Sequence, residues 1–133
     1  GQTAGDDDLA WAESILGSVG LVVRLPESQI DAVTGVAGSG PAYLFLVAEA
    51  LIEAGVLAGL TRPTSEALVA QLFVGSAALL RERGRPADLR AMVTSPGGTT
   101  AAGLRVLEEH GVRSAFLEAV LAAAARSAEL GRH

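Results

Sequence analysis

The sequence predicts an all-α fold, a helical bundle, preceded by a short helix and strand that belong to an α/β domain. Half of the 133 residues are hydrophobic, yet only 4% are aromatic. The chain is also rich in alanine, which favours closely packed helices because alanine costs least in a helix. From residue 27 onward the apolar residues recur with helical spacing. The β-branched run Leu21–Leu25 is the exception and indicates a strand.

The first 25 residues read as the tail of another domain. Asp6–Ser18 is amphipathic and opens with three acids, which suit the positive end of a helix dipole. The strand that follows has no second strand to pair with, and an isolated strand leaves its backbone polar groups unsatisfied. It therefore pairs either with another chain or with a sheet outside this sequence. We expect residues 1–25 to end an α/β domain, residues 26–133 to form a helical domain, and the boundary to lie near Pro26.

The helical domain divides into elements at its glycines and prolines. Ala37–Pro41, "AGSGP", is expected to break the chain, with Ser39 as a helix cap and Pro41 in the first turn. The helix after it is apolar nearly all round, which in a domain this small predicts an oligomer interface. The expected helices are Gln29–Gly35, Ala42–Leu57, Pro63–Arg83, Pro86–Val93, Thr100–His110 and Arg113–Leu130.

Composition excludes several classes of function. The net charge is −5, and the ten arginines are dispersed, which argues against a nucleic-acid partner because phosphates require a basic stripe. Cysteine is absent, which excludes disulfides and thiolate chemistry, and two distant histidines give no reason to expect a metal site. The start of the sequence does not resemble a signal peptide, and the most apolar run, Leu44–Leu60, is short for a bilayer span. We expect no membrane partner and a cytoplasmic location.

The segment Ser95–Thr100, "SPGGTT", supports two interpretations. Its glycines allow a backbone to approach a ligand closely, and the helix that follows begins with amides that lack intrahelical partners. Together these features would bind a small carboxylate, with hydroxyls from Ser95, Thr99 and Thr100 as further donors. The simpler interpretation is a Pro-Gly turn with a threonine N-cap. Spacing alone favours the turn.

Three other features also have a functional and a structural interpretation. "AGSGP" contains part of a dinucleotide fingerprint, but no convincing strand leads into it, so a close-packed helix start is favoured. Glu49 and Glu53 share a helix face and could bind metal or act as acid and base, although a solvated face is the better explanation. His110 precedes Gly111 at a helix end, where a capping role is favoured over catalysis.

Two segments together resemble a known family. "DAVTGVAGSGPAYLFLVAEALIEAGVLAGL" and "MVTSPGGTTAAGLRVLEEHGVRSAFLEAV" are similar to the C-terminal domain of pyrroline-5-carboxylate reductase, over about residues 20–130. Ala37 before "GSGP" is a mild departure from the family pattern. The resemblance implies an oxidoreductase that reduces the cyclic imine 1-pyrroline-5-carboxylate to L-proline with NADPH or NADH, the last step of proline biosynthesis. It also implies a Rossmann cofactor domain, of which residues 1–25 would be the last helix and strand, and long helices that interlock in a homodimer, with possible assembly to a decamer.

The same resemblance assigns roles within Ser95–Thr100. It implies that the hydroxyl of Thr100, the catalytic residue, donates to the imine nitrogen. It implies that the amides around Gly97, Gly98 and Thr99, with the Ser95 hydroxyl, hold the substrate carboxylate. A donor aimed at that nitrogen would stabilise the transition state, and the loop would hold the imine within reach of the nicotinamide. The cofactor-binding residues lie outside this chain, because it contains no strand–GxGxxG–helix unit.

Two further functions remain open at this point. The chain could be a helical dimerisation module without catalysis, which describes the fragment alone, since we expect it to be inactive without a cofactor domain. It could instead come from a two-domain dehydrogenase that acts on hydroxy acids. Such enzymes usually place a lysine in the helical domain, and this chain has none.

Overall fold

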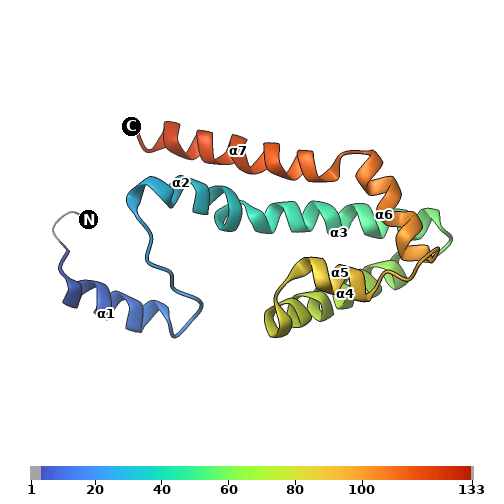
Figure 1. Ribbon diagram of the computed structural model, residues 1–133, viewed down its shortest axis with the longest axis horizontal. Coiled ribbons are helices and arrows are strands. Elements are labelled where there is room, and N and C mark those ends of the chain that lie inside the picture. The colour runs from blue at the N-terminus through green and yellow to red at the C-terminus, as the bar shows by residue number, and fades with distance from the viewer. Residues whose placement is uncertain (1–3, 133) are drawn as a thin grey trace. The chain divides into compact units, whose positions relative to one another are not determined.

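The computed structural model describes residues 4–132 and divides the chain into two units, residues 1–30 and 31–133. Within the described residues every regular element is a helix, as the sequence predicts (Figure 1). The elements are α1 (Asp6–Leu16), the 3₁₀-helix η1 (Glu27–Gln29), α2 (Ile30–Val33), the π-helix η2 (Thr34–Gly38), α3 (Gly40–Leu57), α4 (Arg62–Arg83), α5 (Pro86–Met92), α6 (Thr99–Glu109) and α7 (Val112–Leu130).

The first unit contains α1 and an irregular segment. The helix carries three acids in its first turn, and the Asp8 carboxylate accepts a hydrogen bond from the Gly5 amide at 3.0 Å. The Arg24 guanidinium donates to both carboxylate oxygens of Glu13, with Nη2–Oε2 at 2.8 Å. This contact holds the pKa of Glu13 below its ordinary value. It also ties the irregular segment back to α1.

The strand expected at Leu21–Leu25 does not form. These residues have no regular secondary structure, and most of their side chains are exposed. A strand requires a hydrogen-bonded neighbour, and the described chain supplies none. The predicted boundary near Pro26 stays a prediction, as does the assignment of residues 1–25 to a cofactor domain.

The second unit opens with one nearly continuous helical run, so the break expected at "AGSGP" is wrong. The amide of Ser39 donates to the carbonyl of Thr34 at 2.8 Å, a bond that spans five residues and carries the helix through the glycines. Ser39 is the N-cap residue of α3, as predicted, but it has helical backbone angles and its side chain makes no capping bond. Pro41 lies in the first turn of α3, as predicted.

Two close contacts arrange the long helices. Gly35 is buried against α7, where an added Cβ would lie 2.7 Å from the carbonyl oxygen of Val120. At the other end of α3, the buried Ser65 donates from its hydroxyl to the Ile52 carbonyl at 2.9 Å. A Cβ on Gly55 would lie 2.3 Å from that hydroxyl oxygen. Helices α4 and α7 therefore run alongside the α2–α3 run in the opposite direction (Figure 1).

The chain buries almost no core of its own. Val69 is the buried hydrophobic side chain among the described residues, and α3 has no buried residue. The accessible surface is 10514 Å², whereas a compact monomer of this mass would expose about 6,500 Å². Large side chains such as Phe45 and Leu46 remain 69% and 65% exposed. The all-round apolar helix thus lacks the burial that its sequence predicts, and that burial has to come from outside the chain.

Candidate functional site

Ser95–Gly98 forms a tight turn between α5 and α6. The amide of Gly98 donates to the carbonyl of Ser95 at 3.0 Å. Pro96 occupies the second position, and Gly97 the third with φ 68°. This is the pattern of a type II turn, whose third residue requires a positive φ and hence favours glycine. The turn predicted from "SPGG" is therefore present.

The threonine cap predicted with that turn is wrong, because Gly98 is the N-cap of α6 and no side chain caps it. Thr99 and Thr100 are instead the first two helical residues. A Cβ added to Gly98 would lie 2.4 Å from the Ser95 hydroxyl oxygen. A side chain at position 98 would therefore have to displace the Ser95 hydroxyl, whereas Gly97 is required by its backbone angle.

The first turn of α6 presents unused donors. Within residues 4–132 the structure gives no acceptor for the amides of Thr99, Thr100 and Ala101, nor for the hydroxyls of Ser95 and Thr100. Ser95, Thr99 and Thr100 are exposed. Amides at a helix start carry the positive end of the helix dipole and suit an anion. The structure thus brings the predicted hydroxyls and the predicted Thr99 amide together at one helix end.

The two glycine amides that were predicted to bind the substrate carboxylate differ from each other in the structure. The Gly98 amide is already used by the Ser95 carbonyl. Gly97 supplies the left-handed backbone of the turn. The Gly97 amide has no acceptor within residues 4–132, so it remains available to a ligand together with the donors on the threonine side of the loop.

Three charged residues that join α5, α6 and α7 were not identified from the sequence. The Glu108 carboxylate accepts hydrogen bonds from Arg113 Nε at 2.8 and 2.9 Å, and its Oε1 lies 3.5 Å from Arg90 Nη1. The hydrogen bond from Arg113 holds the pKa of Glu108 below its ordinary value and raises that of Arg113. These residues come from α6, α7 and α5, so no single helical spacing could have revealed the group.

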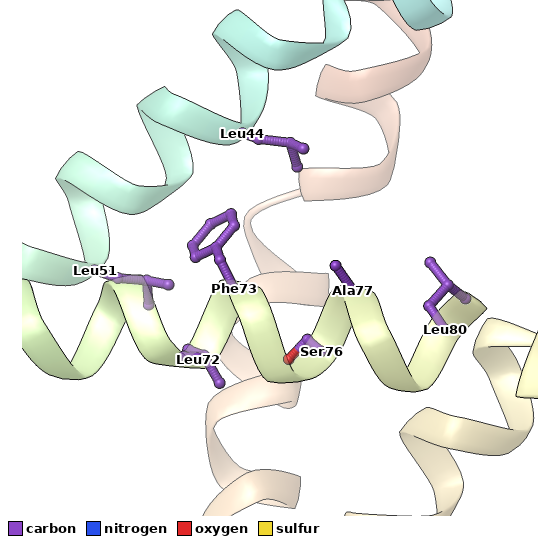
Figure 2. A pocket seen from close by; sticks show the side chains of 7 residues that line it. All are labelled: Leu44, Leu51, Leu72, Phe73, Ser76, Ala77 and Leu80. Carbon is purple, nitrogen blue, oxygen red and sulfur yellow. The ribbon is translucent and has the colours of Figure 1, made fainter. Parts of the chain in front are cut away.

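Apolar grooves open on both sides of α3. Figure 2 shows the groove between α3 and α4, of about 360 Å³, with Phe73 projecting from α4 towards α3. Its lining is Leu44 and Leu51 from α3 and Leu72, Phe73, Ser76, Ala77 and Leu80 from α4. A second groove, of about 270 Å³, lies between α3 and α7, where the Tyr43 hydroxyl meets the Ala119 carbonyl at 3.5 Å. Neither groove has the polar groups that fix a small ligand.

The remaining candidate residues follow their structural interpretations. Glu49 and Glu53 are both exposed on α3, and the described part of the chain holds no group of three metal-ligating side chains. His110 is the C-cap residue of α6, and its amide donates to the Val106 carbonyl at 3.0 Å. The glycines of "AGSGP" lie in and beside the π-helix, which is unlike a dinucleotide loop.

By length and composition alone, two helical stretches could cross a membrane, Glu27–Leu57 and Arg62–Arg83. The first is longer than the sequence suggested, because the π-helical residues join two expected helices into a run of 31 residues. The argument from a short apolar run was therefore wrong. Length and composition are weak grounds for a span, since core and interface helices have the same properties.

Most of the chain matches one known protein family. The family model described as pyrroline-5-carboxylate reductase dimerisation matches residues 27–130. A pyrroline-5-carboxylate reductase of Synechocystis sp. is 54% identical over 95% of this chain and 48% of its own length. One from Corynebacterium melassecola is 52% identical over 96% of this chain and 47% of its own length. This chain thus spans about half the length of the curated relatives it matches.

Solved structures agree with the sequence comparison. A Coxiella burnetii pyrroline-5-carboxylate reductase superposes with a TM-score of 0.91 and 43% identity, over 98% of this chain and 49% of that one. A Plasmodium falciparum pyrroline carboxylate reductase with NADP bound gives a TM-score of 0.89 and 35% identity, over 98% of this chain and 50% of that one. This chain belongs to the pyrroline-5-carboxylate reductase dimerisation family.

Proposed function

We propose that this chain is the dimerisation and substrate-binding part of a pyrroline-5-carboxylate reductase, which reduces 1-pyrroline-5-carboxylate to L-proline with NADPH or NADH. Family membership and the names of the relatives support the activity. The observation that carries the site is the turn at Ser95–Gly98, which leads directly into a helix start with unused amides and hydroxyls. An anionic, nitrogen-containing ring requires donors of this kind.

We assign the substrate carboxylate to the amides of Thr99 and Thr100 and the hydroxyl of Ser95. Gly97 and Gly98 shape the turn that brings these donors together. The Thr100 hydroxyl then donates to the ring nitrogen. Reduction adds a hydride to the C=N carbon and leaves the nitrogen with a new electron pair, which a proton must neutralise. Threonine is a weak acid, so Thr100 orients the nitrogen and does not supply its proton. A neutral imine accepts from the Thr100 hydroxyl and takes its proton from water after hydride transfer. An iminium already carries that proton, and its N–H donates to the Thr100 oxygen instead.

The nicotinamide cofactor would supply the hydride. The described residues do not fit it, since the glycines at Gly38 and Gly40 belong to a helical run rather than to a strand–turn–helix unit. We place the cofactor site in the part of the protein that this chain does not span. The choice between NADPH and NADH belongs to that part.

We infer that the second copy of the chain supplies the missing core. The surface exceeds that of a compact monomer by about 4,000 Å² in each chain, or about 8,000 Å² in two chains. This excess is more than the roughly 2,000–5,000 Å² that obligate homodimers commonly bury in total, so a second copy has ample surface to cover. The grooves on both sides of α3 would receive helices of the partner. We interpret the two long apolar helices as this interface, with no membrane partner. A decamer of such dimers and a cytoplasmic location stay predictions.

Substitution of Thr100 in the full-length enzyme tests the proposal. Thr100→Ala should lower kcat/KM for the imine by at least about tenfold, because a donor to the reacting nitrogen is lost. Thr100→Ser retains the hydroxyl and should stay within about threefold of wild type. Thr99→Ala is the matched control, since it removes the neighbouring hydroxyl and keeps the amide. Sedimentation of each variant should show an intact dimer.

An unchanged kcat/KM for Thr100→Ala would remove Thr100 from the mechanism. Absence of any imine reduction by the full-length protein would favour the non-catalytic dimerisation module. Oxidation of a hydroxy acid would favour the other class of dehydrogenase, which the absence of lysine disfavours.

A further inference from the structure

Three helices meet at the carboxylate of Glu108. This residue lies in the last turn of α6 and accepts from Arg113 near the start of α7, with Arg113 Nη2 at 2.7 Å. Arg90, from α5, approaches the same carboxylate at 3.5 Å. In Figure 1, α5 lies beside α4, and α6 leads from the connecting loop into α7. One carboxylate thus connects the helix before the Ser95–Thr100 loop with the two helices after it.

Arg90 is also next to the residue that directly precedes the loop, Thr94. The Thr94 hydroxyl donates to the Arg90 carbonyl at 2.6 Å, and the Thr94 amide donates to the Ala91 carbonyl at 3.1 Å. The backbone of Arg90 therefore fixes where the loop begins, and its side chain is bound to Glu108. At the other end the loop passes into α6, whose Ala102 amide donates to the Gly98 carbonyl at 3.2 Å.

Backbone packing alone does not hold α5 against α6. In the described chain α5 packs closely on α4, and α6 packs on α7, but α5 and α6 make no such contact. Helix α5 has only seven residues, and helices that short depend on tertiary contacts for their position. Within residues 4–132, Arg90–Glu108 is the ion pair that joins α5 to α6.

We propose that Arg90, Glu108 and Arg113 form a clamp that holds the Ser95–Thr100 loop in the shape in which it binds the substrate carboxylate. This inference rests on the proposed function of the loop. All three are positioning residues, because the donors that we assign to the substrate lie on the loop. A loosened clamp displaces those donors, and the affinity for substrate falls while the bond-making step, once substrate is bound, changes less.

The same helix provides a matched control. Glu109 accepts from Arg105 four residues earlier, so that ion pair stays within α6 and joins no other element. Both glutamates lie in the last turn, and both are partly exposed. Glu109→Gln therefore removes the same charge without opening the clamp.

The test uses the full-length enzyme and the variants Glu108→Gln, Arg90→Gln, Arg90→Lys and Glu109→Gln. Steady-state kinetics give kcat, KM for the imine and KM for the cofactor. Hydrogen–deuterium exchange reports the amides of residues 94–101, and sedimentation reports assembly. Glu108→Gln and Arg90→Gln should raise KM for the imine by about fivefold or more, with kcat and the cofactor KM within about twofold of wild type. Their loop amides should exchange faster. Arg90→Lys should restore much of the affinity, and Glu109→Gln should match wild type.

The proposal is overturned if loop exchange in Glu108→Gln matches that of Glu109→Gln. It is also overturned if the loop amides exchange faster while KM for the imine stays unchanged, and this second outcome would count against the loop as the substrate site. A failure of the proposed function alone appears differently, as a wild-type enzyme that does not reduce the imine.

Discussion

Two adjacent glycines in the loop are required for different physical reasons. Gly97 adopts φ 68°, a backbone angle that other L-residues rarely take. Gly98 has an ordinary backbone angle, and a side chain there would meet the Ser95 hydroxyl oxygen and force it to move. The backbone angle thus favours glycine at position 97, and the space left by Ser95 favours glycine at position 98. Both act on the position of Ser95 relative to the start of α6.

Gly98→Ala should therefore reduce substrate binding. The new methyl group would displace Ser95, and we expect KM for the imine to rise by about fivefold or more in the full-length enzyme. Gly103→Ala is the control on the same helix, because no atom of the chain lies within 4 Å of a Cβ at that position. It should leave KM unchanged and raise the helix stability by about 0.5–1 kcal/mol. Equal kinetic effects of the two substitutions would contradict the steric argument.

At the scale of elements, the π-helix and the clamp both join helices that the sequence separates. The bond from Ser39 to Thr34 merges α2 and α3 into one run, and Gly35 lets α7 approach that run closely. Glu108 joins α5, α6 and α7 around the loop. Each joint depends on one or two side chains, so each is sensitive to a single substitution.

The clamp should weaken in acid. Arg113 holds the pKa of Glu108 below the ordinary value of 4.5 in the folded chain. The contribution of the Glu108 carboxylate to stability is therefore fully present above pH 4.5. It is lost as the pH falls through the pKa that Glu108 has in the folded chain, which lies below 4.5. Denaturant unfolding of wild type and Glu108→Gln, compared across this pH range, should give a difference that is constant above pH 4.5 and shrinks below it. A difference that grows on acidification would contradict the assignment.

At the scale of the whole molecule, the exposed apolar surface is the dominant feature. Thirty large hydrophobic side chains are exposed, and one hydrophobic side chain, Val69, is buried in the part of the chain described. A folded domain requires a core to offset its conformational entropy. The stability of this domain should therefore depend on its association with a second copy.

Association and stability should accordingly change together. The melting temperature of the wild-type protein should rise with protein concentration, because folding is linked to dimerisation. Phe45→Glu places a charge on the exposed apolar face of α3 and should abolish the dimer in sedimentation. Glu82→Gln, an exposed change of charge near the end of α4, should leave it intact. A Phe45→Glu protein that stays dimeric would exclude this face from the interface.

The sequence predicted the helices well and predicted the joints between them poorly. The ends of α4 and α7 were placed within one residue, since periodic apolar residues, prolines and glycines mark them locally. The break at "AGSGP" was wrong because glycine signals a break only when its neighbours lack hydrogen bonds, and π-helical bonds supply them here. The strand at Leu21–Leu25 was wrong for this chain because a strand depends on a neighbour that local sequence cannot provide.

The sequence by itself determined the all-helical class, the apolar surface that requires a partner, and the loop at Ser95–Thr100. These are local properties of composition, periodicity and turn residues. Only the tertiary structure decided which loop amides remain free, that the Ser95 hydroxyl lies against Gly98, and that Arg90, Glu108 and Arg113 meet. The physical reason is that hydrogen bonds and close contacts depend on distances between elements, and the spacing of residues along one helix carries no information about another helix.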